Sequence, residues 1–135
     1  MNYEDPLDFA PQLSGYDSEH QKEIAHETME RYSGSPISAF QPNIILTNFP
    51  QYVDYFAKTR KLKIYEGNAF KVAHSKKEKL TMLDFKIGSP AAALVIDLCS
   101  FLPIEALLLL GMCGGLRTDY HIGDYFVPIS SIRGD

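Results

Sequence analysis

Residues 107–116 read Leu-Leu-Leu-Leu-Gly-Met-Cys-Gly-Gly-Leu, a short apolar run that leads into a loop with three glycines. A continuous apolar run of this length is typical of a strand buried on both faces of a parallel sheet. We therefore expect a central strand here, with Leu108 in the core. Glycines after a strand let the backbone approach a ligand closely because they have no Cβ atom. Since small molecules bind at the carboxyl edge of open α/β sheets, this glycine loop (residues 111–115) is the first candidate for a binding site.

The composition is typical of a soluble globular protein with a single core. The chain has 135 residues, of which 45% are hydrophobic and 22% charged, an ordinary balance for one domain. Its net charge of −4 gives no reason to expect nucleic acid or an anionic membrane as a partner, and no apolar stretch approaches the ~20 residues of a membrane span. The two cysteines, Cys99 and Cys113, and the lack of signal-peptide features predict a reducing, cytoplasmic location.

Helical and strand patterns alternate along the chain, which predicts an α/β fold with a mostly parallel central sheet flanked by helices. Residues 1–16 contain two prolines and a glycine without periodicity, so an irregular arm is expected there. No closing helix follows the last predicted strand, so the domain is expected to be incomplete at its C-terminus. Helices are expected at 18–32, from 50 onward and at 91–102, and strands at 44–46, 62–65, 70–74, 80–87, 106–110 and 125–132.

Apolar spacing predicts which face of each helix is buried. The Gly88-Ser89-Pro90 turn is expected to start the third helix, with Ser89 as its N-cap. The free N–H groups of such a helix start also suit an anion or a sugar, and the sequence leaves both interpretations of Ser89 open. The expected inward residues are Ile24, Thr28 and Tyr32 in the first helix, Tyr52, Val53, Phe56 and Ala57 in the second, and Leu94, Val95, Leu98 and Cys99 in the third.

Motifs of several common enzyme classes do not occur in this sequence. The four histidines show no metal-ligand spacing with the two cysteines, so no metal site is predicted. The chain contains neither a G-x-S-x-G elbow nor a P-loop. The glycines at 111, 114 and 115 also differ in spacing from the dinucleotide-binding fingerprint. We therefore expect no cofactor.

Several motifs resemble, in the same order, those of the nucleoside phosphorylase and nucleosidase superfamily, above all its AMP nucleosidase branch. They are ERYSG at 30–34, LTNF at 46–49, GSPAA at 88–92, GMCGGLR at 111–117, IGDY at 122–125 and SIRGD at 131–135. The resemblance implies a nucleoside phosphorylase-like three-layer sandwich, with residues 17–135 forming the N-terminal part of a single domain. It also implies assembly as a homo-oligomer, commonly a hexamer in this family.

The sequence departs from the family where phosphorylases bind inorganic phosphate. Phosphorylases of the family use an arginine and a serine or threonine at the end of the central strand, and a second arginine after the first strand. By resemblance, Leu109, Met112 and Tyr52 occupy these positions here. A phosphate dianion needs fixed cations or donors, typically a bidentate arginine, which these side chains do not supply. The resemblance therefore favours water over phosphate as the nucleophile.

The function that the resemblance implies is hydrolysis of the N-glycosidic bond of AMP to adenine and ribose 5-phosphate, through an oxocarbenium-like cation. The family's general acid belongs to its second half, so it is expected beyond Asp135, and the 135-residue chain alone is expected to be inactive. The alternatives are another purine nucleosidase or phosphorylase of the same fold, and a non-catalytic fragment that binds nucleotide or assembles. The implied substrate-binding positions are Ser89, Met112, Cys113, Gly114 and Arg133, with Arg117 as a second candidate cation for the 5′-phosphate.

Overall fold

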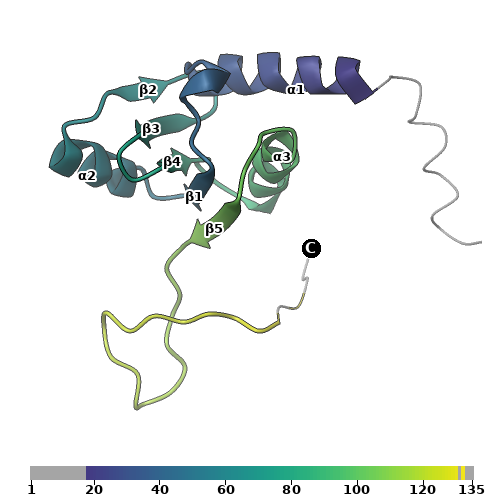
Figure 1. Ribbon diagram of the computed structural model, residues 1–135. Coiled ribbons are helices and arrows are strands. Elements are labelled where there is room, and N and C mark those ends of the chain that lie inside the picture. The colour runs from purple at the N-terminus through teal and green to yellow at the C-terminus, as the bar shows by residue number, and fades with distance from the viewer. Residues whose placement is uncertain (1–17, 131, 133–135) are drawn as a thin grey trace, which may run out of the picture.

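The computed structural model describes residues 18–130 and residue 132. The arm expected at 1–16 and the candidate Arg133 lie outside the described residues. The elements follow one another as shown in Figure 1. In chain order they are α1 (Ser18–Ser33), the 3-10 helix η2 (Ile37–Ala39), β1 (Asn43–Thr47), α2 (Pro50–Arg60), β2 (Ile64–Glu66), β3 (Lys71–Ser75), β4 (Leu80–Asp84), α3 (Ser89–Cys99) and β5 (Ala106–Leu110).

The described strands form one sheet of five strands in the order β2-β3-β4-β1-β5. β1 runs parallel to β4 and to β5, whereas β3 runs antiparallel to both of its neighbours, β2 and β4. The predicted α/β class is confirmed, but the sheet is mixed rather than mostly parallel. The connections at residues 67–70 and 76–79 are the reason, because turns this short can join only antiparallel strands.

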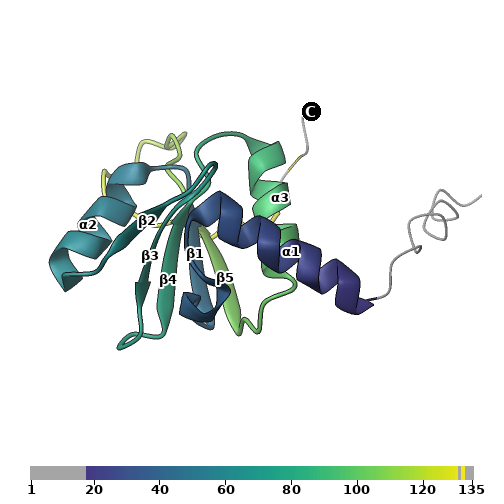
Figure 2. The ribbon, with the colours of Figure 1, turned by 90° about the horizontal axis from the view of Figure 1, so that it is seen from above.

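Helices cover both faces of this sheet, so the molecule has three layers (Figures 1 and 2). α1 and α3 pack on one face, where their buried residues share a core cluster with Leu46 and Leu83. α2 packs on the other face, in a second cluster with Ala73 and Met82. Met82 and Leu83 are neighbours in β4 but belong to different clusters, since successive side chains of a strand point to opposite faces. The three-layer sandwich is therefore confirmed.

α1 buries a different face from the one predicted. Each residue that α1 buries lies one position after a residue that was predicted to be buried, and the predicted Ile24 is 46% exposed. The sparse apolar pattern of this helix did not fix its rotation; the core is filled instead by the long, adaptable side chain of Met29. Tyr32 then packs at the rim, edge-on to Phe70 with 5.7 Å between ring centroids. The buried residues of α1 are Ala25, Met29 and Ser33.

α2 and α3 follow the prediction more closely. α2 starts at Pro50 and buries Val53, Phe56 and Ala57 as expected. α3 buries three of its four predicted inward residues; the fourth, Leu94, is 42% exposed. Ser89 is the first residue of α3 and not its N-cap. Gly88 takes the N-cap position with a φ of 87° and no side-chain hydrogen bond, a backbone angle that favours glycine over serine.

β5 lies at the edge of the described sheet and not at its centre. Among the described strands only β1 pairs with it, and Leu108 is 58% exposed. The expectation that Leu108 is buried is therefore wrong, because an apolar run predicts a strand but not the neighbours that will cover it. The strand expected at 125–132 is wrong as well. Residues 125–130 have no regular structure, since no described strand runs beside them to take their backbone hydrogen bonds.

Candidate functional site

Three parallel strands end together at one edge of the sheet. In the β1–β4 ladder Thr47 is paired with Asp84, and in the β1–β5 ladder Thr47 is paired with Leu110. The loop that leads to Ser89 follows β4, and the glycine loop follows β5. The structure thus brings two of the predicted site segments to the same edge, the carboxyl edge, where open α/β sheets bind their ligands.

A row of polar side chains crosses the sheet at this edge. Lys71 of β3, Asp84 of β4 and Thr47 of β1 are successive cross-strand partners, so they lie on one face. It is the face that α2 covers, since Met82, two residues before Asp84, belongs to the core cluster of α2. The Lys71 ammonium pairs with Asp54 of α2 at 2.5 Å. This polar row (Lys71, Asp84, Thr47) therefore separates the apolar core from the loops at the carboxyl edge.

Asp84 is buried in this row, with an exposed fraction of 0%. Its Oδ1 accepts the backbone N–H of Lys86 at 2.9 Å, and the ammonium of Lys86 lies 3.5 Å from Oδ2. Oδ2 accepts no hydrogen bond from any residue that the structure describes. The same ammonium also reaches Glu66 Oε1 at 3.3 Å. Because exposed ion pairs contribute little, the burial of Asp84 is not explained by Lys86 alone.

The sequence prediction gave Asp84 no role, since it placed this residue inside a longer strand at 80–87. β4 ends at Asp84 instead, and Lys86 takes a left-handed φ of 68° directly after it. An acidic residue at the end of an apolar strand, followed by a Gly-Ser-Pro turn, was the available signal. Charged residues are rarely fully buried, so a fully buried carboxylate at the edge where open α/β sheets bind ligands makes Asp84 a candidate functional residue.

The glycine loop borders a hollow of about 290 Å³, which Cys113, Gly114, Arg117 and Phe126 help to line. Arg117 donates two hydrogen bonds to Asp119, at 2.9 and 2.8 Å, and these bonds hold the pKa of Asp119 below its ordinary value. A Cβ atom added at Gly114 would meet no atom within 4 Å. Of the predicted site residues, Cys113 and Gly114 line this hollow, whereas the exposed Met112 does not.

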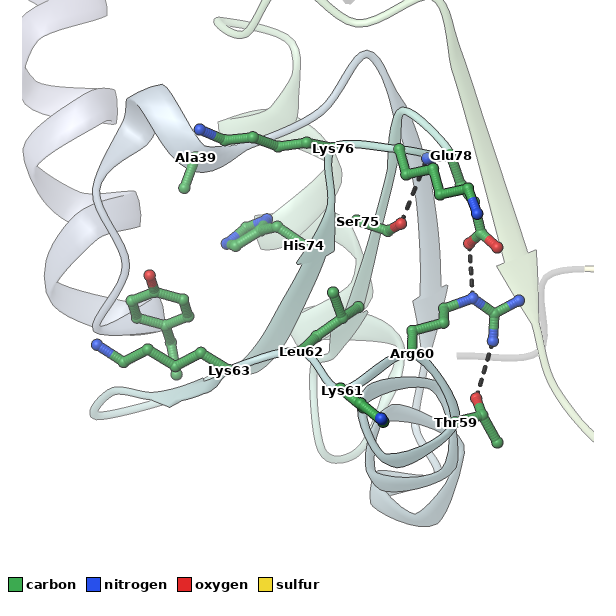
Figure 3. Close-up of a pocket in the computed structure, with 12 residues that line it drawn as sticks. Ala39, Thr59, Arg60, Lys61, Leu62, Lys63, His74, Ser75, Lys76 and Glu78 are labelled. Atoms are coloured by element: carbon green, nitrogen blue, oxygen red, sulfur yellow. Dashed lines mark hydrogen bonds and ion pairs between the residues drawn. The ribbon is translucent and has the colours of Figure 1, made fainter.

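A larger hollow of about 640 Å³ lies at the opposite edge, between the end of α2 and the β3–β4 turn (Figure 3). Its lysines, among them Lys61, Lys63 and Lys76, extend in different directions and do not converge on one point. His74 faces it with both ring nitrogens engaged, by Ser35 Oγ at 2.8 Å and Thr81 Oγ1 at 2.9 Å. Burial lowers the pKa of His74 to about 4, so this imidazole is neutral at pH 7 and adds no positive charge.

The larger hollow therefore offers an open cationic rim without fixed donors, and the carboxyl edge remains the better candidate for the binding site.

In the part of the chain that the structure describes, no three His, Cys, Asp or Glu side chains are grouped to hold a metal ion. No helix among the described residues combines the length and the apolarity needed to cross a membrane.

Comparisons with known proteins agree with this architecture. The model of the family described as "Phosphorylase superfamily" matches residues 42–135. AMP nucleosidases of Escherichia coli K12 and O157:H7 are each 25% identical to the chain over 166 residues, an alignment that covers 96% of this chain and 34% of theirs. A crystal structure of AMP nucleosidase from Bacteroides thetaiotaomicron VPI-5482 superposes with a TM-score of 0.73 at 33% identity, covering 81% of this chain and 47% of that one. The chain thus spans about a third of the curated relatives' length.

Proposed function

The chain belongs to the phosphorylase superfamily, and on this premise we propose that it forms part of an enzyme that hydrolyses the N-glycosidic bond of AMP. The products are adenine and ribose 5-phosphate. The observation that carries the proposal is the likeness to AMP nucleosidases, which covers 96% of the chain in sequence and 81% in structure. A purine nucleoside hydrolase or phosphorylase is the coarser statement that this likeness supports.

Within this proposal the carboxyl edge binds the substrate. The glycine loop at Gly114 leaves open space for a flat base, and Cys113 beside it lines the same hollow. Ser89 at the start of α3, Met112 and Arg133 are the other proposed substrate contacts. Arg117 is already held by Asp119, which makes it the weaker candidate for the 5′-phosphate. We propose further that the enzyme acts in the cytoplasm as a homo-oligomer, as a hexamer in analogy with its family.

Water is the proposed nucleophile. The positions at which family phosphorylases carry phosphate-binding residues hold Leu109, Met112 and Tyr52, and none of these side chains is a cation. Leu109 and Met112 are 54% and 65% exposed and offer no hydrogen-bond donor to an oxyanion. The ribosyl centre gains positive charge as the bond to the base breaks, and the base must be protonated as it leaves. We assign no general acid to the described residues.

Product analysis tests this proposal. The complete enzyme of which this chain is proposed to form part is purified and incubated with AMP, adenosine or uridine, with and without inorganic phosphate, and the sugar products are separated. We expect ribose 5-phosphate from AMP at a rate that does not depend on phosphate. Ribose 1,5-bisphosphate that increases with added phosphate would contradict hydrolysis. Binding of AMP without any turnover would contradict the enzymatic assignment and support a binding or assembly role.

Gly114→Val should weaken AMP binding at least tenfold and leave the melting temperature nearly unchanged. The added side chain has no neighbour within 4 Å of its Cβ, so the fold tolerates it, but it occupies the space that the base needs. The dissociation constant of AMP and the melting temperature, measured on the same preparation, check the expected loss of binding and the expected retention of stability. Ile24→Val, at a side chain of α1 that is 46% exposed and lies outside this hollow, is the control. Equal AMP affinity in wild type and Gly114→Val would place the base elsewhere.

A further inference from the structure

The buried carboxylate of Asp84 is not accounted for by the fold. Asp84 is the only charged residue among the described ones that is fully buried, and its Oδ2 accepts no hydrogen bond from a described residue. An ionised carboxylate loses its hydration when it is buried, and this loss is compensated only by donors or cations. Asp84 has one full hydrogen bond, from the Lys86 N–H at 2.9 Å. The other oxygen, Oδ2, has only the Lys86 ammonium beside it, at 3.5 Å.

Two lysines and a helix start lie near Asp84. Lys71, its cross-strand partner on β3, is paired with Asp54, and the Lys86 ammonium lies 3.5 Å from Oδ2. α2 begins at Pro50, just after Thr47, the partner of Asp84 on β1. No side chain caps the start of this 11-residue helix, and the free N–H groups and the dipole of a helix start attract anions. Cations and a helix start thus converge on the edge where the strands end.

We infer that Asp84 is a specificity-determining residue that supplies this edge with a built-in anion and so excludes inorganic phosphate from it. The inference rests on the proposed hydrolytic function and deepens it. The phosphate-binding cations of phosphorylases are replaced by Leu109, Met112 and Tyr52, which explains why phosphate is not attracted. The nearby lysines already pair with Asp54 and Glu66, and the Asp84 carboxylate adds a further negative charge at the edge where α2 starts.

The chemistry separates the two nucleophiles at this position. Water carries no net charge, so the buried carboxylate does not repel it. A phosphate dianion at this edge would bring a second negative group near a carboxylate that is shielded from solvent, where repulsion between like charges is strongest. Lys86 cannot offset both anions, because its ammonium is already shared with Glu66 at 3.3 Å. A fixed carboxylate therefore selects water without forming any bond to the substrate.

The test is the affinity for inorganic phosphate of wild type, Asp84→Asn and Asp97→Asn, measured by isothermal titration calorimetry on the purified protein. Asparagine retains the Oδ1 acceptor for the Lys86 N–H and removes only the charge. We expect Asp84→Asn to bind phosphate at least tenfold more tightly than wild type. Asp97→Asn makes the same change of charge on the exposed side of α3 and should bind phosphate as wild type does. Thermal melts confirm that each variant is folded, and Asp84→Ser serves as a second charge-removing variant.

The outcomes separate this inference from the proposed function. Tighter phosphate binding by Asp84→Asn in a complete enzyme that does not cleave AMP would refute the proposed reaction and support the role of Asp84. A protein that hydrolyses AMP but whose Asp84→Asn and Asp84→Ser variants bind phosphate no more tightly would overturn the role of Asp84. Failure of both variants to fold would also overturn it, because the carboxylate would then be needed by the fold itself.

Discussion

Leu83→Asp should prevent this protein from folding, whereas Leu108→Asp should leave a protein that unfolds cooperatively. Leu83 lies in β4 between two paired strands and has an exposed fraction of 0%. The substitution removes a buried apolar side chain and inserts an unpaired charge in the core, two costs that together reach about 5–10 kcal/mol. This range is comparable to the entire stability of an ordinary domain, about 5–15 kcal/mol. Circular dichroism and urea unfolding of both variants measure the difference.

Leu108 is the matched control because it carries the same substitution in a neighbouring part of the same sheet. It is 58% exposed on β5, so an aspartate there keeps much of its hydration, and we expect a loss of about 1 kcal/mol or less. If Leu108→Asp unfolded the protein as completely as Leu83→Asp, β5 would be covered on both faces, and its position at an open edge would be wrong.

This contrast shows what the sequence could predict and what it could not. Local signals were read correctly: Pro50 marked the start of α2, and the spacing of Val53, Phe56 and Ala57 gave its buried face. The apolar run at 106–110 correctly predicted both ends of β5. The burial of Leu108 was predicted wrongly, because burial depends on which strands lie alongside, and no residue within the run encodes that.

The same limit applies to the segments that lack strong local patterns. The face of α1 was missed by one residue, since its apolar positions are few and Met29 could reach the core as well as the predicted Ile24. Residues 125–130 have strand-like composition, but strand propensity without a partner strand does not produce a strand. In both cases tertiary contacts decided what the composition left open.

The candidate site was predicted in part. The glycine loop and the turn before Ser89 follow strands that end at one edge, and this much follows from their sequence signals and the rules of parallel sheets. Asp84 was missed because its burial is a property of register: it is enclosed only when β4 pairs with Thr47 on one side and Lys71 on the other. Register is set by the whole sheet, so a single acidic residue at the end of a strand does not reveal whether it will be buried.

The contact of α1 with the β2–β3 turn leads to the second large effect. Gly67→Ala should destabilise the protein by about 3 kcal/mol or more, because backbone atoms and not flexible side chains occupy the space. A Cβ atom at Gly67 would lie 2.4 Å from the carbonyl oxygen of Tyr32 and 2.5 Å from the amide nitrogen of Gly34. These backbone atoms are themselves fixed, since the Tyr32 carbonyl accepts the N–H of Phe70 at 2.8 Å and the Gly34 N–H donates to Glu30 at 2.8 Å.

Gly111→Ala is the control for this prediction. A Cβ atom at Gly111 would meet nothing within 4 Å, and alanine in a compatible backbone conformation reduces the freedom of the unfolded chain, so we expect no loss of stability. The free energies of unfolding in urea provide the comparison. Equal stability of the two variants would mean that the end of α1 and the β2–β3 turn are not joined backbone to backbone. The clash at Gly67 predicts instead that the ERYSG segment and this turn separate together, with the loss of the hydrogen bonds from Ala69 and Phe70 to Tyr32.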